Sequence, residues 1–261
     1  MSLDRRDFLK ITALTALFGL GSASAFKLLS PDEILANVEG AASGQLGMVI
    51  DMELFQTPTT IENVIEACNR AHNVPSIDNT KHEIKWIWTE KYENAFPENT
   101  SEHLSEELKA KPFLVLCNHC DHPACVRVCP TQATFKRKSD GIVQMDYHRC
   151  IGCRFCMAAC PYGSRSFNWE NPRKYIKDVN PDYPTRTIGV VEKCNFCIER
   201  IERGLKPACV DASEGAMVFG KLDDPDSAVR AALATNYAVT RKTDLGTGPN
   251  VYYIIGGQEH A

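Results

Sequence analysis

Twelve cysteines are the residues of this 261-residue chain whose type and spacing could do chemistry. Eight of them form two neighbouring runs, Cys117-x2-Cys120-x4-Cys125-x3-Cys129-Pro130 and Cys150-x2-Cys153-x2-Cys156-x3-Cys160-Pro161. In such a run, three close thiolates can bind three corners of one [4Fe–4S] cube, while the cysteine before proline reaches the cube of the other run. The two runs therefore predict two cubes. Their ligands are Cys117, Cys120, Cys125 and Cys160 for cluster B, and Cys129, Cys150, Cys153 and Cys156 for cluster C.

The four remaining cysteines predict a third cube. Cys194-x2-Cys197-x11-Cys209 supplies three ligands, and a fourth is due at position 213, which is a serine. Only Cys68 is left over, so counting assigns it to cluster A together with these three. Zinc is the alternative for each set, because CxxC pairs also bind zinc. Zinc rarely needs a four-cysteine run that ends in Cys-Pro, so the spacing favours iron–sulfur.

Short strands and helices must position these cysteines. Apolar patterns predict strands over 48–51, 81–92 and 251–255. Apolar residues at helical spacing predict a helix over 61–70 that carries Cys68, and a second helix is expected over 198–204.

The N-terminal residues have the order of an export signal. An arginine pair at positions 5 and 6 precedes an apolar run over 11–20 and an Ala-Ser-Ala sequence at 23–25. This order predicts a twin-arginine signal peptide over 1–25 and an extracytoplasmic protein on the periplasmic face of the membrane. No stretch reaches the roughly 20 apolar residues that span a bilayer, so the chain is not expected to cross the membrane. A net charge of −4 argues against nucleic acid as a partner.

The sequence resembles the four-cluster, ferredoxin-type electron-transfer subunits of complex iron–sulfur molybdoenzymes and related membrane complexes. The resemblance covers about 46–225 and depends on the two central runs and on segment 190–220. It implies an α+β fold of two ferredoxin-like cluster-binding halves, one continuous and inserted into the other, with loop-rich extensions. The implied parts of the chain are an N-terminal segment over 26–45, a split half with one cluster over 46–110 and 188–225, a continuous half with two clusters and a trailing loop over 111–187, and a C-terminal extension over 226–261.

The chain departs from that family at one cluster. Its first cysteine run is reduced to Cys68, since Phe55, Pro58 and Val64 stand near the positions of the other three cysteines, and Ser213 stands where their partner belongs. All four ligands of one cube are therefore missing together. In the family this cube faces the molybdenum subunit. We therefore expect three [4Fe–4S] clusters, and a chain that no longer docks a molybdenum enzyme.

The resemblance implies electron transfer, with no catalytic residue. The pattern is most similar to that of the exported iron–sulfur subunit of the membrane complex associated with dissimilatory sulfite reduction. Its implied partners are a polytopic membrane quinone-site subunit and a multihaem c-type cytochrome or other redox subunit. The alternatives are an electron-transfer subunit of a molybdopterin oxidoreductase for polysulfide or tetrathionate, an enzyme with a substrate-binding open cluster near Ser213, and a structural metal protein. Arg127, Arg154 and Lys193 lie near cysteines and could raise cluster potentials or dock a partner, but each is expected to be a solvated charge.

Overall fold

The structure is a computed structural model that describes residues 44–55 and 57–256. The described residues belong to one compact unit with an α+β fold. The predicted signal peptide over 1–25 lies outside these residues. Within the described part of the chain, no helix is both long enough and apolar enough to cross a membrane.

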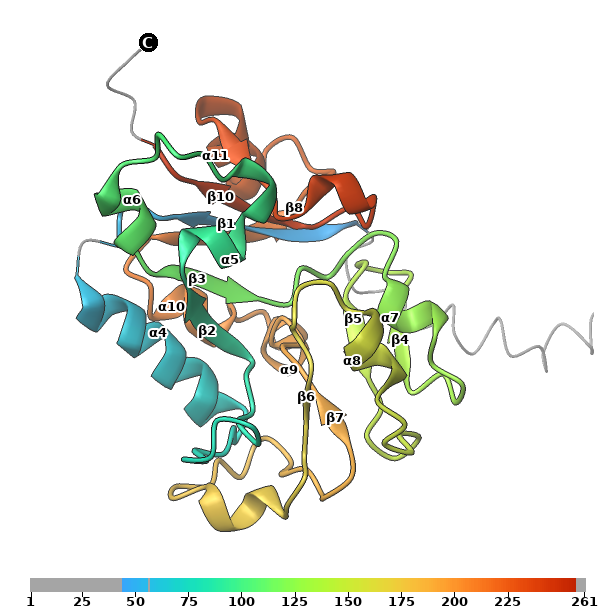
Figure 1. Cartoon of the computed structure of the whole chain (residues 1–261). Helices are drawn as coiled ribbons and strands as arrows, with labels where there is room; N and C mark the ends of the chain where they lie inside the picture. The colour runs from blue at the N-terminus through green and yellow to red at the C-terminus, as the bar shows by residue number, and fades with distance from the viewer. Residues whose placement is uncertain (1–43, 56, 257–261) are drawn as a thin grey trace, which may run out of the picture. The chain divides into compact units, whose positions relative to one another are not determined.

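A four-stranded sheet forms the largest regular element of the fold (Figure 1). Its strand order is β8 (Met217–Lys221), β1 (Leu46–Asp51), β10 (Val251–Ile254) and β9 (Ala238–Val239). The central strand β1 runs antiparallel to β8 and parallel to β10, with Met48 opposite both Phe219 and Val251. Both faces of β1 are covered, which explains its continuous apolar sequence.

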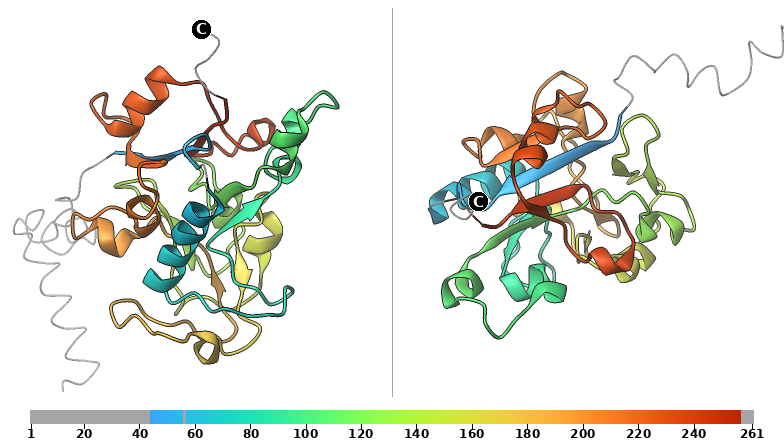
Figure 2. Two further views of the ribbon diagram at one scale, coloured as in Figure 1. Left: turned by 90° about the vertical axis from the view of Figure 1, so that its left-hand side faces the viewer. Right: turned by 90° about the horizontal axis from the view of Figure 1, so that it is seen from above.

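Helices and a second small sheet cover the two faces of this sheet. Helix α11 (Ala228–Thr235) packs over β1 and β8 on one face (Figure 2). On the other face lies the main hydrophobic core, to which α4 (Pro58–Ala71) and the antiparallel pair β2 (Ile87–Glu90) and β3 (Phe113–Leu116) contribute. Helix α4 begins at an N-cap, Thr57, whose hydroxyl accepts a hydrogen bond from the Thr60 N–H.

Except for Cys68, which lies on α4, the cysteines lie on or beside shorter elements. These shorter elements are α7 (Ala124–Arg127), β4 (Thr134–Lys136), β5 (Val143–Met145), α8 (Phe155–Ala159), β6 (Ser166–Phe167), β7 (Val191–Glu192), α9 (Ile198–Ile201) and α10 (Ala208–Asp211). Strand β4 pairs with β5, and β6 pairs with β7, in both cases antiparallel. The remaining elements are α5 (Tyr92–Ala95), α6 (Glu106–Ala110) and the 3-10 turns η1 (Pro97–Asn99), η2 (Pro172–Tyr175) and η3 (Thr243–Leu245).

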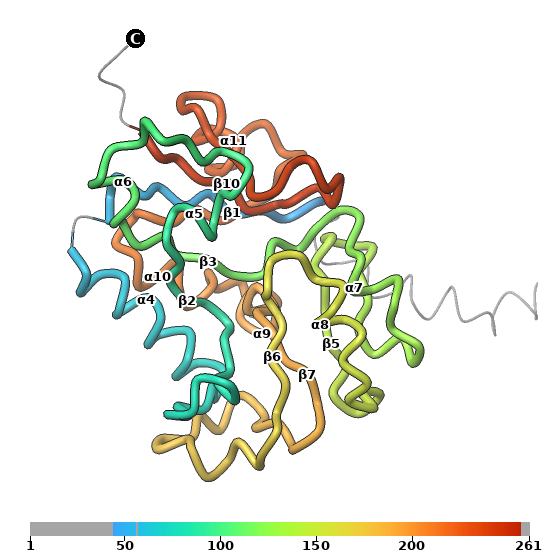
Figure 3. The backbone as a smooth tube through the Cα atoms, viewed as in Figure 1, coloured from blue at the N-terminus to red at the C-terminus, as the bar shows by residue number. Residues whose placement is uncertain are grey.

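Segments far apart in the chain meet beside α4. The backbone trace in Figure 3 shows α10 beside α4, with α9 farther toward the middle of the molecule, and α4 packs against α10. A buried ion pair strengthens this region, since the Arg186 guanidinium lies 2.6 Å from the Glu192 carboxylate and neither side chain is exposed. Arg186 also donates to the carbonyl of Asn73, just beyond α4, at 2.8 Å.

Most predicted elements are confirmed. The expected strands over 48–51 and 251–255 correspond to β1 and β10, and the expected helix over 61–70 is α4. The expected strand over 81–92 is mostly wrong, since only Ile87–Glu90 is extended in a sheet. Its first half instead uses side-chain partners, because the Lys85 N–H donates to the Ser166 hydroxyl and the Trp86 indole donates to Glu192. The expected helix over 198–204 is the single turn α9.

Candidate metal centres

All twelve predicted ligand cysteines lie in the described part of the chain, and all have free thiols. We refer to the three groups of four cysteines that the spacing predicts as sets A, B and C. Each set is held by a different group of elements.

Set A joins Cys68 of α4 to three cysteines around α9 and α10: Cys194, Cys197 and Cys209. All four side chains are buried. Burial, and then the charges of these three cysteines, raise the pKa of the Cys68 thiol well above its ordinary value, so Cys68 lies close to each of them. Cys68, Cys194 and Cys209 also belong to one buried cluster of the main core.

Backbone N–H groups point at the sulfurs of set A. The Phe196 N–H donates to Cys194 Sγ at 3.5 Å, and the Ala208 N–H donates to Cys197 Sγ at 3.3 Å. Phe196 and Cys197 both adopt left-handed backbone conformations, with φ of 57° and 55°. Left-handed conformations cost free energy in residues other than glycine, and they cluster at functional sites. Their presence at Phe196 and Cys197 therefore fits a binding site at this turn.

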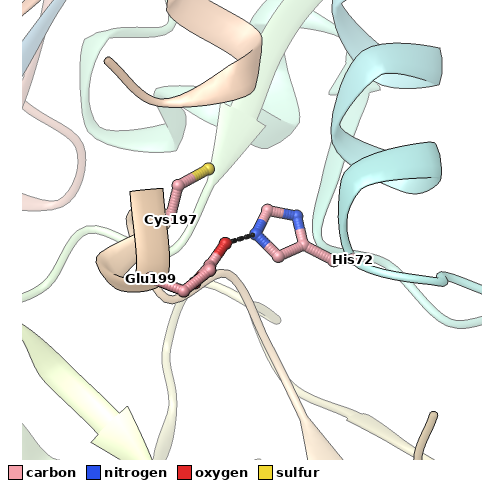
Figure 4. A group of neighbouring side chains, drawn as sticks. All are labelled: His72, Cys197 and Glu199. Atoms are coloured by element: carbon pink, nitrogen blue, oxygen red, sulfur yellow. Dashed lines mark hydrogen bonds and ion pairs between the residues drawn. The ribbon is translucent and has the colours of Figure 1, made fainter. Parts of the chain in front are cut away.

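A histidine and a carboxylate border set A (Figure 4). His72 Nε2 lies 2.9 Å from the Glu199 carboxylate, and His72 Nδ1 lies 3.0 Å from the carbonyl oxygen of Cys68. Burial alone would raise the pKa of Glu199, but the hydrogen bond and the charge of His72 more than offset it, so the pKa lies below its ordinary value. His72, Cys197 and Glu199 are close enough to hold a cation, but Cys197 already belongs to set A.

Set B lines a small cavity. Its walls include all four predicted ligands of cluster B together with Asn118, Arg165 and Thr247; the four ligands are Cys117, Cys120, Cys125 and Cys160. Burial and the neighbouring Cys117 raise the pKa of the Cys120 thiol to about 12. The Asn118 side chain is buried, and neither its amide nitrogen nor its amide oxygen has a partner in the described structure. A buried amide without a partner is unfavourable. A bound group that accepts hydrogen bonds would therefore satisfy the N–H donors of Asn118 in this cavity.

Set C is more exposed than the other two. Cys156 is buried on α8 and interacts with Cys150, whereas Cys129, Cys150 and Cys153 are partly exposed. Burial tends to raise the pKa of Cys129, but N–H donors of the turn that follows, together with the Thr131 hydroxyl, lower it below its ordinary value. Donors of this kind also stabilise the thiolate that binds a metal.

The turn of set C requires a glycine. Gly152, between Cys150 and Cys153, has a φ of +69°, and a Cβ atom there would lie 2.4 Å from the carbonyl oxygen of Gly189. Backbone of another segment thus approaches this turn too closely for any side chain.

The three sets follow one another in the order A, B, C. The charge of Cys117 in set B acts on Cys194 in set A, and the charge of Cys125 in set B acts on Cys156 in set C. Helix α7 packs against α8, which accounts for the second approach. Between sets A and B, the His119 ring stacks on the Phe196 ring with a centroid distance of 3.7 Å.

Three of the four positions at which the family's cluster ligands are missing are buried: Phe55, Val64 and Ser213. Phe55 and Val64 are buried in the main core. The buried Ser213 hydroxyl donates to the Val210 carbonyl at 2.8 Å and accepts from the Met217 N–H at 3.0 Å. Pro58 occupies the first turn of α4, where proline is well tolerated. Each of these four positions therefore has a structural role.

Sequence reasoning was wrong about one charge and missed several residues. Lys193, expected to be solvated, is 1% exposed, and its ammonium donates to the carbonyl of Cys194 at 2.6 Å. Arg127 and Arg154 are exposed, as expected. The missed residues beside the cysteines are Asn118, Arg165 and Thr247. Asn118 could have been suspected from its place between Cys117 and Cys120, but the sequence gives no sign that Thr247 approaches set B.

Comparison with known proteins supports iron–sulfur chemistry at these cysteines. A family model described as a 4Fe-4S dicluster domain matches residues 110–177, which contain both central runs. The chain is 39% identical to the Hdr-like menaquinol oxidoreductase iron–sulfur subunit 1 of Archaeoglobus fulgidus, over 98% of this chain and 100% of that protein. The chain belongs to the family of iron–sulfur subunits of oxidoreductase complexes.

Other members of this family share most of the chain. The menaquinone reductase iron–sulfur cluster-binding subunit of Nitratidesulfovibrio vulgaris is 34% identical over 80% of this chain and 88% of that protein. The arsenate respiratory reductase iron–sulfur subunit of a Shewanella species is 35% identical over 80% of this chain and 96% of that protein. Because these relatives are iron–sulfur subunits of oxidoreductase complexes, they are consistent with an electron-transfer subunit that has no catalytic site of its own. The 4Fe-4S family model also agrees with iron–sulfur, and not zinc, at the central runs.

Proposed function

We propose that this chain holds three [4Fe–4S] clusters and relays electrons between a quinone-reactive membrane subunit and an extracytoplasmic redox partner. The proposed ligands are Cys68, Cys194, Cys197 and Cys209 for cluster A, Cys117, Cys120, Cys125 and Cys160 for cluster B, and Cys129, Cys150, Cys153 and Cys156 for cluster C. The observation that carries the proposal is the proximity of Cys68 to Cys194, Cys197 and Cys209. With Cys68 assigned to these three, the twelve cysteines form three sets of four.

The residues around the sets fit such clusters. A [4Fe–4S] cluster supplies one-electron chemistry, with a potential set by hydrogen bonds to sulfur, by charge and by solvent exposure. The chain buries all four thiols of set A, and in set B it buries those of Cys117 and Cys120. The N–H groups of Phe196 and Ala208 donate to sulfurs of set A, and the unpartnered Asn118 amide offers a donor to a cluster in set B. The proposed order A, B, C would let electrons pass through the protein in steps between neighbours.

The names of the relatives support a quinone-linked complex. Two of them are named as subunits of a menaquinol oxidoreductase and a menaquinone reductase. We therefore propose a polytopic membrane quinone-site subunit and a multihaem c-type cytochrome as partners, as in the membrane complex associated with dissimilatory sulfite reduction. We further propose that the twin-arginine signal over 1–25 directs the chain to the periplasmic face of the membrane.

The burial of Phe55, Val64 and Ser213 argues against the two alternative functions, an electron-transfer subunit of a molybdopterin oxidoreductase and an enzyme with an open cluster. A molybdopterin oxidoreductase would need an electron path at the end where Phe55, Val64 and Ser213 now lie in the core. A substrate-binding open cluster would need space and a free ligand near Ser213, whose hydroxyl already has two hydrogen-bond partners. The similarity to the arsenate respiratory reductase subunit keeps the first of these as the second candidate.

The division into two ferredoxin-like halves is part of the same proposal. It is supported by the pairing of β1 with β8 and by the packing of α4 against α10, which join 46–71 to 208–221 across the intervening chain. In this arrangement the split half carries set A, and the continuous half carries sets B and C.

An anaerobic reductive titration tests the proposed function. The intact chain, purified with its clusters, should take up about three electrons, one for each cube, and should release them on reoxidation. Uptake of no electrons would leave a structural metal protein. Uptake of two would mean that set A holds no redox-active cube. Reoxidation by an added c-type cytochrome, and rereduction by a menaquinol analogue, would support the proposed partners.

A further inference from the structure

Four lysine or arginine side chains are buried in the described part of the chain: Arg165, Arg186, Lys193 and Arg241. Arg186 has a carboxylate partner, Glu192, at 2.6 Å. Among the described residues, the other three have no carboxylate within ion-pair distance. A buried cation without a counter-charge is strongly unfavourable. Something other than a carboxylate must therefore balance these three charges.

The three unpaired cations all lie beside the cysteine sets. Arg241 lies over the ring of Tyr162, next to set B, with its guanidinium carbon 5.5 Å from the ring centroid. Lys193 donates to the carbonyls of Cys194 and Val143, and its charge acts on Cys194 in set A and on His119 in the set B run. Within the described part of the chain, the three buried cations without a carboxylate thus lie beside cysteine sets, whereas Arg186 is paired with Glu192.

Arg165 lies between sets B and C. Its charge acts on Cys125 and Cys117 of set B and on Cys156 of set C. One guanidinium nitrogen also lies 3.8 Å from the sulfur of Met145, the last residue of β5. It lines the cavity of set B and is 4% exposed. The planar fork of a guanidinium offers five N–H donors, so one side chain can serve sulfurs of both sets at once.

The position of Arg165 follows from the repeat of the two runs. Arg165 lies five residues after Cys160, and Thr134 lies five residues after Cys129, so the two occupy equivalent places in the two halves of the repeat. They also touch, because the Arg165 guanidinium donates to the Thr134 hydroxyl at 2.7 Å. One half of the repeat thus supplies a cation at the junction, and the other half supplies a neutral acceptor that orients it.

We propose that Arg165 is a shared positive charge that raises the reduction potentials of clusters B and C together, and that Lys193 does the same for clusters A and B. This inference rests on the proposed function, since it takes sets A, B and C to be clusters. A reduced cube is more negative than an oxidised one, so a fixed neighbouring cation favours reduction. Arginine keeps its proton at all physiological pH values. One electron therefore passes between neighbours without a proton transfer or a broken bond, and one partner is oxidised as the other is reduced.

The test compares midpoint potentials in the intact, cluster-loaded chain, measured by anaerobic redox titration with electron paramagnetic resonance. Arg165→Gln should lower two of the three potentials, so that the reduced-to-oxidised ratio at a fixed potential falls at least tenfold, which is about 59 mV for one electron. Lys193→Gln should also lower two potentials, and only one of the affected clusters should be common to both variants. Arg149→Gln is the matched control, because Arg149 adjoins Cys150 but its side chain is 63% exposed. Solvent and salt should keep its effect below twofold.

The outcomes separate the inference from the proposed function. A wild-type chain that takes up no electrons would overturn the proposed function itself. Loaded variants whose three potentials match the wild type, or all shift equally, would overturn only the shared-charge inference. If Arg165→Gln fails to load its clusters, Arg165→Lys decides. If the Arg165→Lys chain binds its clusters and the potentials of clusters B and C stay near the wild-type values, the result supports a role for the charge. If this variant also fails to bind its clusters, Arg165 has a purely structural role.

Discussion

Replacement of Ser213 by alanine tests whether the fourth cluster position has become part of the protein core. The Ser213 hydroxyl accepts from the buried Met217 N–H at 3.0 Å, just where β8 begins. The other partner, the Val210 carbonyl, keeps a second donor in the Ser213 N–H at 3.2 Å. The substitution therefore leaves one buried N–H group without an acceptor. An unsatisfied buried donor costs about 1–3 kcal/mol of the free energy of unfolding.

The assay for Ser213→Ala is urea unfolding of the cluster-loaded chain under anaerobic conditions, followed by circular dichroism, with iron measured on the same sample. For a urea m value of about 2–3 kcal/mol/M, the midpoint should fall by about 0.3–1.5 M. Iron content should not change, since Ser213 touches no cysteine set in this account. The exposed Ser76→Ala is the matched control and should leave the midpoint unchanged. Loss of iron with an unchanged midpoint would refute the reasoning, because Ser213 would then be a cluster ligand.

Three further predictions concern the surroundings of the sets. Arg186→Met leaves the Glu192 carboxylate buried without its cation and should cost about 3–5 kcal/mol of unfolding free energy, measured by denaturant titration. Gly152→Ala places a Cβ atom against the Gly189 carbonyl and should remove the iron of cluster C, measured as iron per chain. Asn118→Leu removes a buried amide donor from the set B cavity, so it should lower one midpoint potential with unchanged iron; an unchanged potential would mean that the amide faces no cluster.

The cysteine spacing was informative because ligand geometry is local. Three thiolates of one cube must come from one tight turn, and this requirement appears directly in the runs that contain Cys117 and Cys150. Counting also assigned Cys68 to set A, because it was the one cysteine left over. The strand β1 and the helix α4 were evident from apolar residues that recur at the period of the element.

Other features could not be predicted, since they depend on contacts between distant segments. Whether Lys193 points inward or outward is decided by the carbonyls of Val143 and Cys194, which no local pattern reveals. The role of Thr247 depends on the C-terminal segment crossing set B, where its hydroxyl lies 2.5 Å from the hydroxyl of Tyr162 in the wall of the cavity. Segment 81–86 alternates like a strand, but its polar groups pair with Ser166 and Glu192 instead of a neighbouring strand.

Iron and acid-labile sulfide per anaerobically purified chain, with and without Cys68→Ser, test the central claim most directly. Three cubes predict about 12 iron and 12 sulfide per wild-type chain, and about 8 of each when the Cys68 ligand of cluster A is removed. Val64→Ala, one turn earlier on the buried face of α4, is the matched control and should retain about 12 of each. A wild-type chain with about 8 iron that is indifferent to Cys68→Ser would contradict the account, and so would one with about 16.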